Sequence, residues 1–172
     1  MVQVWDLPLR LGHWALAALV IIAWLTPNTH DMLHRIVGYG VIALLLFRFV
    51  RGGVRSHFAR LLRTLLALPS YATALARGKK RRYLRLNPAG AAMLVALLVA
   101  LSVSGITGAM QVTVRFFGVW WVEDTHAYAS NAVMVLVVLH VAGTIFMSVL
   151  QRENLPRAMI TGNKQRRSLS TR

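Results

Sequence analysis

Four long apolar segments dominate this chain and set the limits on its fold. They cover residues 8–26, 32–50, 88–110 and 125–150, and each is about 19 to 26 residues long, enough to cross a hydrocarbon core of about 30 Å. In lipid, a single segment can satisfy its own backbone hydrogen bonds only as a helix. We therefore expect an all-α protein, a membrane four-helix bundle that forms one domain over residues 1–172.

The charged residues are segregated from these segments and indicate how the chain is oriented. The 20 Lys+Arg far outnumber the 5 Asp+Glu. All of the basic residues except Arg35 and Arg115 fall on one side of a four-span topology, chiefly in a loop at 51–87 and a tail at 151–172. Positively charged loops stay in the cytoplasm, so both termini are predicted to be cytoplasmic, in a bacterial inner membrane. A soluble basic surface for nucleic acid is excluded by this segregation.

Three shorter stretches are predicted to lie at the membrane surfaces. Residues 56–76 place leucines at helical spacing between arginines, which indicates an amphipathic helix in the cytoplasmic interface. The basic run at 79–82 fits contact with anionic lipid, or with an acidic cytoplasmic partner. The aromatic residues at 116–121 fit an interfacial aromatic belt on the opposite side, or a docking surface for a periplasmic protein.

The histidines are the candidate metal ligands on the four predicted helices. His126 and His140 are 14 positions apart in the last segment. At about 100° and 1.5 Å per residue, this spacing places both rings within about 40° of one helix face and about 21 Å apart along the axis. The last helix would therefore present one imidazole near each side of the membrane, as two stacked haems require.

The remaining ligands are predicted from their depth. His13 lies toward the inner end of the first helix and His34 toward the outer end of the second, so we expect His13 to pair with His140 and His34 with His126. Neutral imidazole is a good axial ligand for haem iron, and helix bundles build such sites from facing helices. The absence of cysteine excludes iron–sulfur clusters and covalent c-type haem, so haem at these histidines would be held without a covalent link.

The roles of two other histidines are open, and so is an alternative role for the four paired ones. His30 is one turn from His34, but it precedes the expected helix cap Asp31 and so falls in the turn. His57 lies in the inner loop, as an interfacial polar residue or as a contact to a haem propionate or a quinone. A single intramembrane histidine can also serve as a hydrogen-bonding or proton-relay group, although that use does not explain four histidines at matched depths.

Glycines and arginines near these histidines fit a bound porphyrin. A flat macrocycle needs small neighbours, and a glycine lies close to three of the four ligands: Gly12, Gly38 and Gly143. Close helix packing is the alternative use of such glycines. Guanidinium groups suit anionic propionates, and the candidates at the inner side are Arg10, Arg48 and Arg51. Contact with lipid phosphates is their alternative role.

Several short motifs resemble the bacterial cytochrome b561 family, which includes the cytochrome b subunits of nickel–iron hydrogenases. In chain order they are Val4-Trp5-Asp6-Leu7-Pro8 with His13-Trp14, Leu33-His34-Arg35 with Gly38-Tyr39, Phe47-Arg48, Asn87-Pro88-Ala89-Gly90, His140-Val141-Ala142-Gly143, and the tail from Arg152-Glu153-Asn154-Leu155 to Ala158-Met159-Ile160-Thr161-Gly162. The resemblance implies four helices, two haems b held by His13, His34, His126 and His140, and electron exchange with quinone. Relatives often have Gly-His where this chain has Arg85-Leu86, which puts a quinone contact at that position in doubt.

The predicted function is transmembrane electron transfer between the quinone pool and a periplasmic cytochrome c or oxidoreductase subunit. An electron-transfer subunit is favoured over a stand-alone enzyme, and the direction of electron flow is open. One alternative is a self-contained superoxide:quinone oxidoreductase, which the near absence of outer positive charge disfavours. The other is a haem-free membrane anchor or proton-handling protein, which predicts a colourless product.

Overall fold

Four long helices form the protein and confirm the predicted all-α membrane bundle. The computed structural model describes residues 2–3, 6–26, 31–51, 62–77, 87–151 and 154–164. Within these, four helices are long and apolar enough to cross a membrane: α1 (Leu7–Leu25), α2 (Asp31–Arg51), α5 (Pro88–Gln111) and α6 (Trp120–Gln151).

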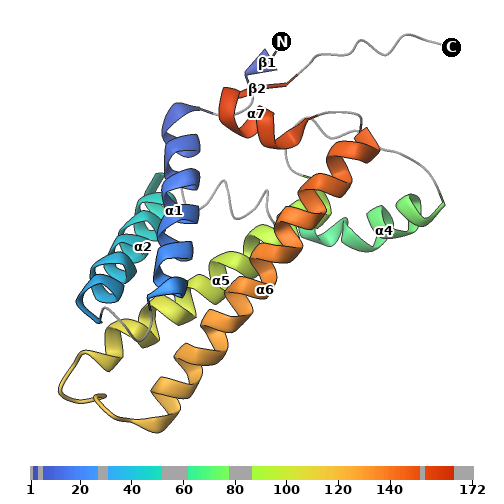
Figure 1. Cartoon of the computed structure of the whole chain (residues 1–172). Coiled ribbons are helices and arrows are strands. Elements are labelled where there is room, and N and C mark those ends of the chain that lie inside the picture. Colours follow the sequence, from blue (N-terminus) through green and yellow to red (C-terminus); the bar gives the residue numbers. More distant parts are fainter. Residues whose placement is uncertain are drawn as a thin grey trace, which may run out of the picture.

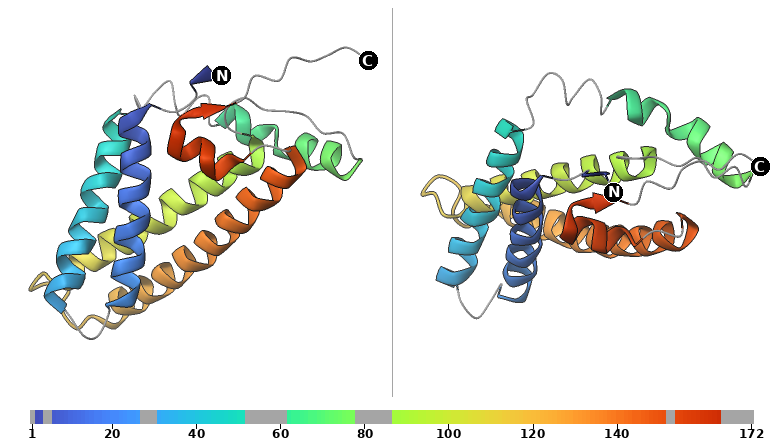
Figure 2. Two further views of the ribbon diagram at one scale, coloured as in Figure 1. Left: turned by 45° about the horizontal axis from the view of Figure 1, so that its top comes forward. Right: turned by 90° about the horizontal axis from the view of Figure 1, so that it is seen from above.

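The four helices are arranged as two hairpins that cross each other. Helix α1 packs on α2, α5 packs along α6, and the hairpins meet mainly where α2 contacts α5. Figures 1 and 2 show the two hairpins inclined to each other, with the last turn of α1, the first turn of α2 and the loop between α5 and α6 at one end of the bundle. The opposite end carries the termini and the shorter elements, so the two ends differ in composition.

The helix ends follow from local sequence. The Asn87 side chain caps α5 by accepting a hydrogen bond from the Gly90 amide at 2.6 Å, and Pro88 occupies the first turn, where its missing N–H costs nothing. Asp6 also precedes a helix with a first-turn proline, but its side chain makes no cap hydrogen bond. Helix α6 begins at Trp120 rather than at Thr125, so part of the expected surface loop is helical.

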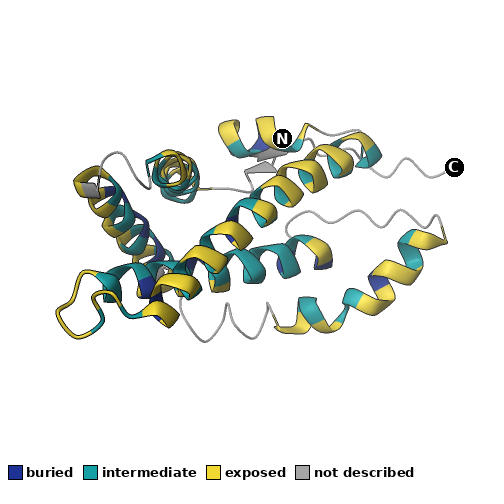
Figure 3. Ribbon diagram, turned by 60° about the horizontal axis from the view of Figure 1, so that its bottom comes forward, coloured by how far each residue is buried: buried dark blue, intermediate teal, exposed yellow. Residues whose placement is uncertain are grey.

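An apolar cluster lies where the hairpins cross. Its buried members are Val41 and Leu45 of α2, Leu101 of α5 and Val133 of α6, and α1 adds partly buried residues such as Leu16. Elsewhere large apolar side chains are exposed on the outward faces of the helices (Figure 3). In a membrane protein such faces contact lipid, so little apolar surface needs to be buried inside.

The end of the bundle near the termini carries three small elements. Helix α4 (Leu68–Ala76) follows a helical turn at 62–66 and contacts α5; the remainder of the amphipathic segment expected at 56–76 lies outside the described residues, as does the basic run at 79–82. Helix α7 (Leu155–Thr161) leads to strand β2 (Asn163–Lys164), which pairs antiparallel with β1 (Val2–Gln3).

Helix α4 is attached to the bundle through Tyr71, which is buried against it. The Tyr71 hydroxyl donates to Met147 Sδ of α6 at 3.8 Å and accepts from Asn87 Nδ2 at 3.5 Å. The residue that caps α5 therefore also helps to hold α4 in place.

Candidate functional site

Two histidines face each other near the end of the bundle that carries the termini. The rings of His13 on α1 and His140 on α6 have centroids 6.2 Å apart, with an angle of 59° between their planes. The rings of Trp14 and His13 pack in a T-shaped arrangement, with centroids 5.6 Å apart. We call His13 and His140 the terminal pair.

A second pair lies near the end that carries the connecting loops. The rings of His34 on α2 and His126 on α6 also have centroids 6.2 Å apart, with their planes at 86°. We call His34 and His126 the loop pair. Helix α6 therefore contributes one ring to each pair, and the first hairpin contributes the other.

Both rings of the loop pair are oriented by backbone carbonyls. His34 Nδ1 lies 3.0 Å from the Ala23 carbonyl oxygen of α1, and His126 Nδ1 lies 2.9 Å from the Ser104 carbonyl oxygen of α5. A carbonyl oxygen can only accept, so each Nδ1 carries the proton and donates it. This tautomer leaves each Nε2 with a free lone pair, as a metal ligand requires.

The spacing of both pairs fits a single metal ion between two axial imidazoles. With metal–nitrogen bonds of about 2 Å and ring radii of about 1.1 Å, two imidazoles on opposite sides of one ion have centroids about 6 Å apart. No group of three or more His, Cys, Asp or Glu gathers within the described part of the chain to hold a bare ion. Two imidazoles alone suit an iron whose other ligands come from a porphyrin.

One glycine that the sequence analysis did not single out gives the His126 ring its space. A Cβ on Gly108 of α5 would lie 2.9 Å from His126 Cε1 and 3.2 Å from its Nδ1. Gly105, one turn earlier, similarly admits Ile42 of α2, whose Cγ1 would lie 3.0 Å from an added Cβ. The pair of glycines three residues apart in the third segment is the sequence signal that could have indicated this close approach.

The three predicted glycines border open space instead. A Cβ on Gly12, Gly38 or Gly143 would meet nothing within 4 Å. They therefore do not serve close helix packing among the described residues, and the space beside them is compatible with a porphyrin or a lipid chain.

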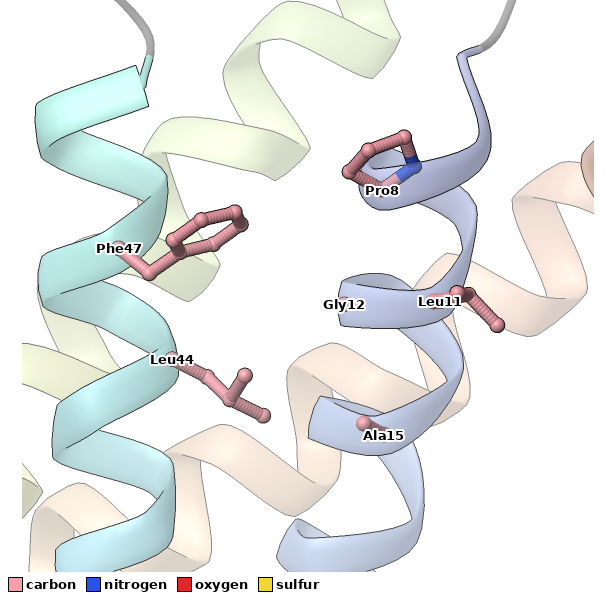
Figure 4. A pocket seen from close by; sticks show the side chains of 6 residues that line it. All are labelled: Pro8, Leu11, Gly12, Ala15, Leu44 and Phe47. Carbon is pink, nitrogen blue, oxygen red and sulfur yellow. The ribbon is translucent and has the colours of Figure 1, made fainter.

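Gly12 also borders an apolar groove of about 370 Å³ between α1 and α2. Figure 4 shows Phe47 and Leu44 on α2 across from Gly12 and Ala15 on α1, with Pro8 and Leu11 completing the lining. No lining side chain offers a hydrogen bond, so the groove suits a hydrocarbon chain and not a polar head group.

The predicted arginines differ in what surrounds them. Arg48 of α2 is close enough to His13 for their charges to interact. Arg10 of α1 donates from Nη1 to the Thr161 carbonyl oxygen at 3.2 Å, while its Nε is buried and has no hydrogen-bond partner among the described residues. The side chain of Arg51 lies outside the described residues, and so do His30 and His57.

A membrane four-helix bundle with a facing imidazole pair near each end is typical of a membrane cytochrome that binds b-type haem. The chain matches the family described as Prokaryotic cytochrome b561 over residues 4–162. It belongs to this family, as its motifs predicted, and is a multi-pass bacterial membrane protein for transmembrane electron transfer through haem b. A search of curated proteins and a search of solved structures each found no match.

Proposed function

We propose that the protein transfers electrons between the quinone pool and a periplasmic redox partner through two haems b, one held by each histidine pair. The observation that supports this most directly is the equal centroid separation of 6.2 Å in both pairs. A packing or proton-relay role would not require two rings at the distance of bis-imidazole ligation at both ends of the bundle.

The chain's own residues would bind and orient the two groups. A bound haem supplies the one-electron couple of its iron. The four imidazoles would hold the two irons, and the carbonyls of Ala23 and Ser104 keep the loop pair in the tautomer that leaves Nε2 free. Arg10 and Arg48 lie near the terminal pair, where guanidinium groups can neutralise propionates.

The direction of the chain in the membrane is part of this proposal. Among the described residues, the end with the termini carries Arg10, Arg48, Arg63, Arg77 and Arg157. The opposite end carries only Arg35 and Arg115, so the positive-inside rule favours cytoplasmic termini. The terminal pair would then lie toward the cytoplasm, and α4 would lie at the inner surface.

Quinone access is proposed at the cytoplasmic side, beside the terminal pair. The apolar groove next to Gly12 suits the isoprenoid tail of a quinone, because its lining is entirely hydrocarbon. The quinone head needs hydrogen-bond donors, which this groove does not provide, so the head would have to bind closer to the charged surface.

The periplasmic partner is proposed to dock near the loop pair. Phe117 is 80% exposed and Trp120 is 73% exposed at this end, and Arg115 lies over the Phe116 ring, 5.5 Å from its centroid. A cytochrome c or an oxidoreductase subunit could use this surface. Insertion into the lipid interface is the other use of the same side chains.

A haem count with single-histidine variants tests the proposal. The protein purified in detergent should show a reduced-minus-oxidised spectrum of haem b, with two haems per chain by pyridine haemochrome. His13→Ala or His34→Ala should each remove one haem, because iron bound by one imidazole in an enlarged cavity is released more easily. The matched control is His30→Ala, four positions before His34 in the sequence, which should retain both.

Two results would contradict the assignment. A colourless protein from cells with ample haem would exclude the relay altogether. Loss of a haem in His30→Ala but not in His34→Ala would show that His30, and not His34, is the outer ligand.

A further inference from the structure

The two helices that carry the terminal pair have little direct contact. Helix α1 packs on α2, and α6 packs on α5, so His13 and His140 belong to different hairpins. In the views of Figures 1 and 2, α1 and α6 diverge toward the end with the termini. Direct packing of α1 on α6 therefore does little to fix the separation of these two rings, which depends on the contact of α2 with α5 and on whatever else joins the two hairpins.

A segment that follows α6 returns to α1 and joins the two helices. The Leu155 amide that begins α7 donates to Ser148 Oγ of α6 at 3.1 Å. At its other end, α7 is tied to α1 by the hydrogen bond from Arg10 to the Thr161 carbonyl. Strand β2 then pairs with β1, just ahead of α1. We call α7, β2 and β1 together the clasp.

Local sequence determines the path of the clasp. Asn154 caps α7 by accepting from the Arg157 amide at 2.9 Å, and Ala158 is the buried residue of this helix. Gly162 ends the helix at φ +80°, a left-handed conformation that glycine adopts without strain. This turn directs the chain into β2, so the clasp depends on a glycine at position 162.

Arg10 links the clasp to the terminal pair. It lies one turn before His13, on the same face of α1. One nitrogen of its guanidinium is hydrogen-bonded to the clasp, whereas its buried Nε has no partner within the described parts of the chain. A buried N–H without a partner is costly, and the propionate of a haem bound at the terminal pair would satisfy it.

We propose that the clasp is a positioning element for the terminal haem alone: it ties α1 to α6 so that His13 stays opposite His140, and it holds Arg10 where its Nε–H can meet a propionate. This inference rests on the proposed haem binding at the terminal pair. The loop pair does not need the clasp, because its rings are fixed by hydrogen bonds to adjacent helices.

The test is to strain the clasp in the full chain and measure each haem separately. Gly162→Val forces a β-branched residue into a left-handed conformation, which should weaken retention of the terminal haem about tenfold. Gly118→Val is the matched control, since Gly118 also has a positive φ, of 71°, but lies in the loop at the far end. Haem content, the rate of haem release to apomyoglobin and the midpoint potentials are measured. The same variants are also made in a His34→Ala protein, in which only the terminal haem should be present.

A disulfide provides a rescue that a general loss of stability would not show. The chain has no cysteine, and Val2 and Lys164 are partners in the β1–β2 register. Oxidised Val2→Cys/Lys164→Cys combined with Gly162→Val should restore the terminal haem. Arg10→Met should lower the midpoint potential of the terminal haem and leave that of the loop haem unchanged.

Each outcome decides the inference. Loss of one haem in Gly162→Val, restoration by the disulfide and two haems in Gly118→Val support it. Two unchanged haems in Gly162→Val, loss of both haems, or an unchanged terminal potential in Arg10→Met would overturn it. A wild-type protein with no haem would instead refute the proposed function, so the two failures are distinguishable.

Discussion

The loop pair and the terminal pair have the same ring separation but are held in different ways. Both rings of the loop pair donate to backbone carbonyls of adjacent helices, and Gly108 lets α5 close over one of them. Among the described residues, neither ring of the terminal pair has a hydrogen bond of this kind. The terminal pair instead has positively charged neighbours, since Arg48 is close to His13 and Arg10 is one turn away.

This difference predicts unequal haem potentials. A hydrogen bond from Nδ1–H to a carbonyl makes an imidazole a more basic ligand, which stabilises oxidised iron and lowers the potential. Nearby arginines disfavour the extra positive charge of oxidised iron and raise the potential. We therefore expect the terminal haem to have the higher midpoint potential, so that an electron at equilibrium resides there.

The largest difference between the two haems is expected in the variant Gly108→Ala. Its Cβ would overlap the His126 ring, and overpacking of this kind costs about 1–3 kcal/mol. The ring should be displaced from its carbonyl, so the loop haem should be lost or weakly bound while the terminal haem remains. Haem content by pyridine haemochrome and a redox titration measure this.

The control for this variant is Gly105→Ala on the same helix. Its added Cβ would press on Ile42 and on neither histidine pair. The variant should unfold more easily but retain both haems. Equal loss of haem in the two alanine variants would show that α5 acts only through general packing.

A smaller effect is expected from Arg48→Met. Removing a positive charge near His13 should lower the midpoint potential of the terminal haem on the order of 50 mV, close to the 59 mV of a tenfold change in a one-electron equilibrium. The loop haem should titrate as before and serves as the internal reference. Arg48→Lys should retain most of the wild-type potential; if both variants shift equally, side-chain shape and not charge is responsible.

The smallest effect is expected from Thr107→Val. The Thr107 hydroxyl lies 3.4 Å from His126 Nδ1, whereas the Ser104 carbonyl lies 2.9 Å from the same atom. The carbonyl is the main acceptor, so the loop potential should change by much less than in Arg48→Met. A large change would assign the orientation of the ring to the hydroxyl.

Short-range patterns were enough to predict the helices and which histidines meet. The spacing of His126 and His140 and the depths of His13 and His34 depend only on helix geometry and on the order of the spans. The assignment of these residues as iron ligands remains a prediction, as does the use of Arg51.

Features that depend on contacts between distant segments could not be predicted. Nothing in residues 2–3 or 163–164 indicates that they pair, because two-residue strands carry no periodicity. The role of Gly108 depends on which face of α5 meets His126, and that follows from the crossing of the hairpins. The unused cap at Asp6 shows the same limit, since the preference of a residue for a helix start does not determine what its side chain contacts.

The apolar cluster at the crossing of the hairpins has a consequence for energy conversion. Val41, Leu45, Leu101 and Val133 lie between the depths of the two pairs and provide no group that could carry a proton. If each pair holds a haem as proposed, electrons would pass between the two haems while this cluster gives protons no route alongside them. Each electron would then move as uncompensated charge through part of the membrane field, which costs or yields about 2.3 kcal/mol per charge for a full crossing at 100 mV.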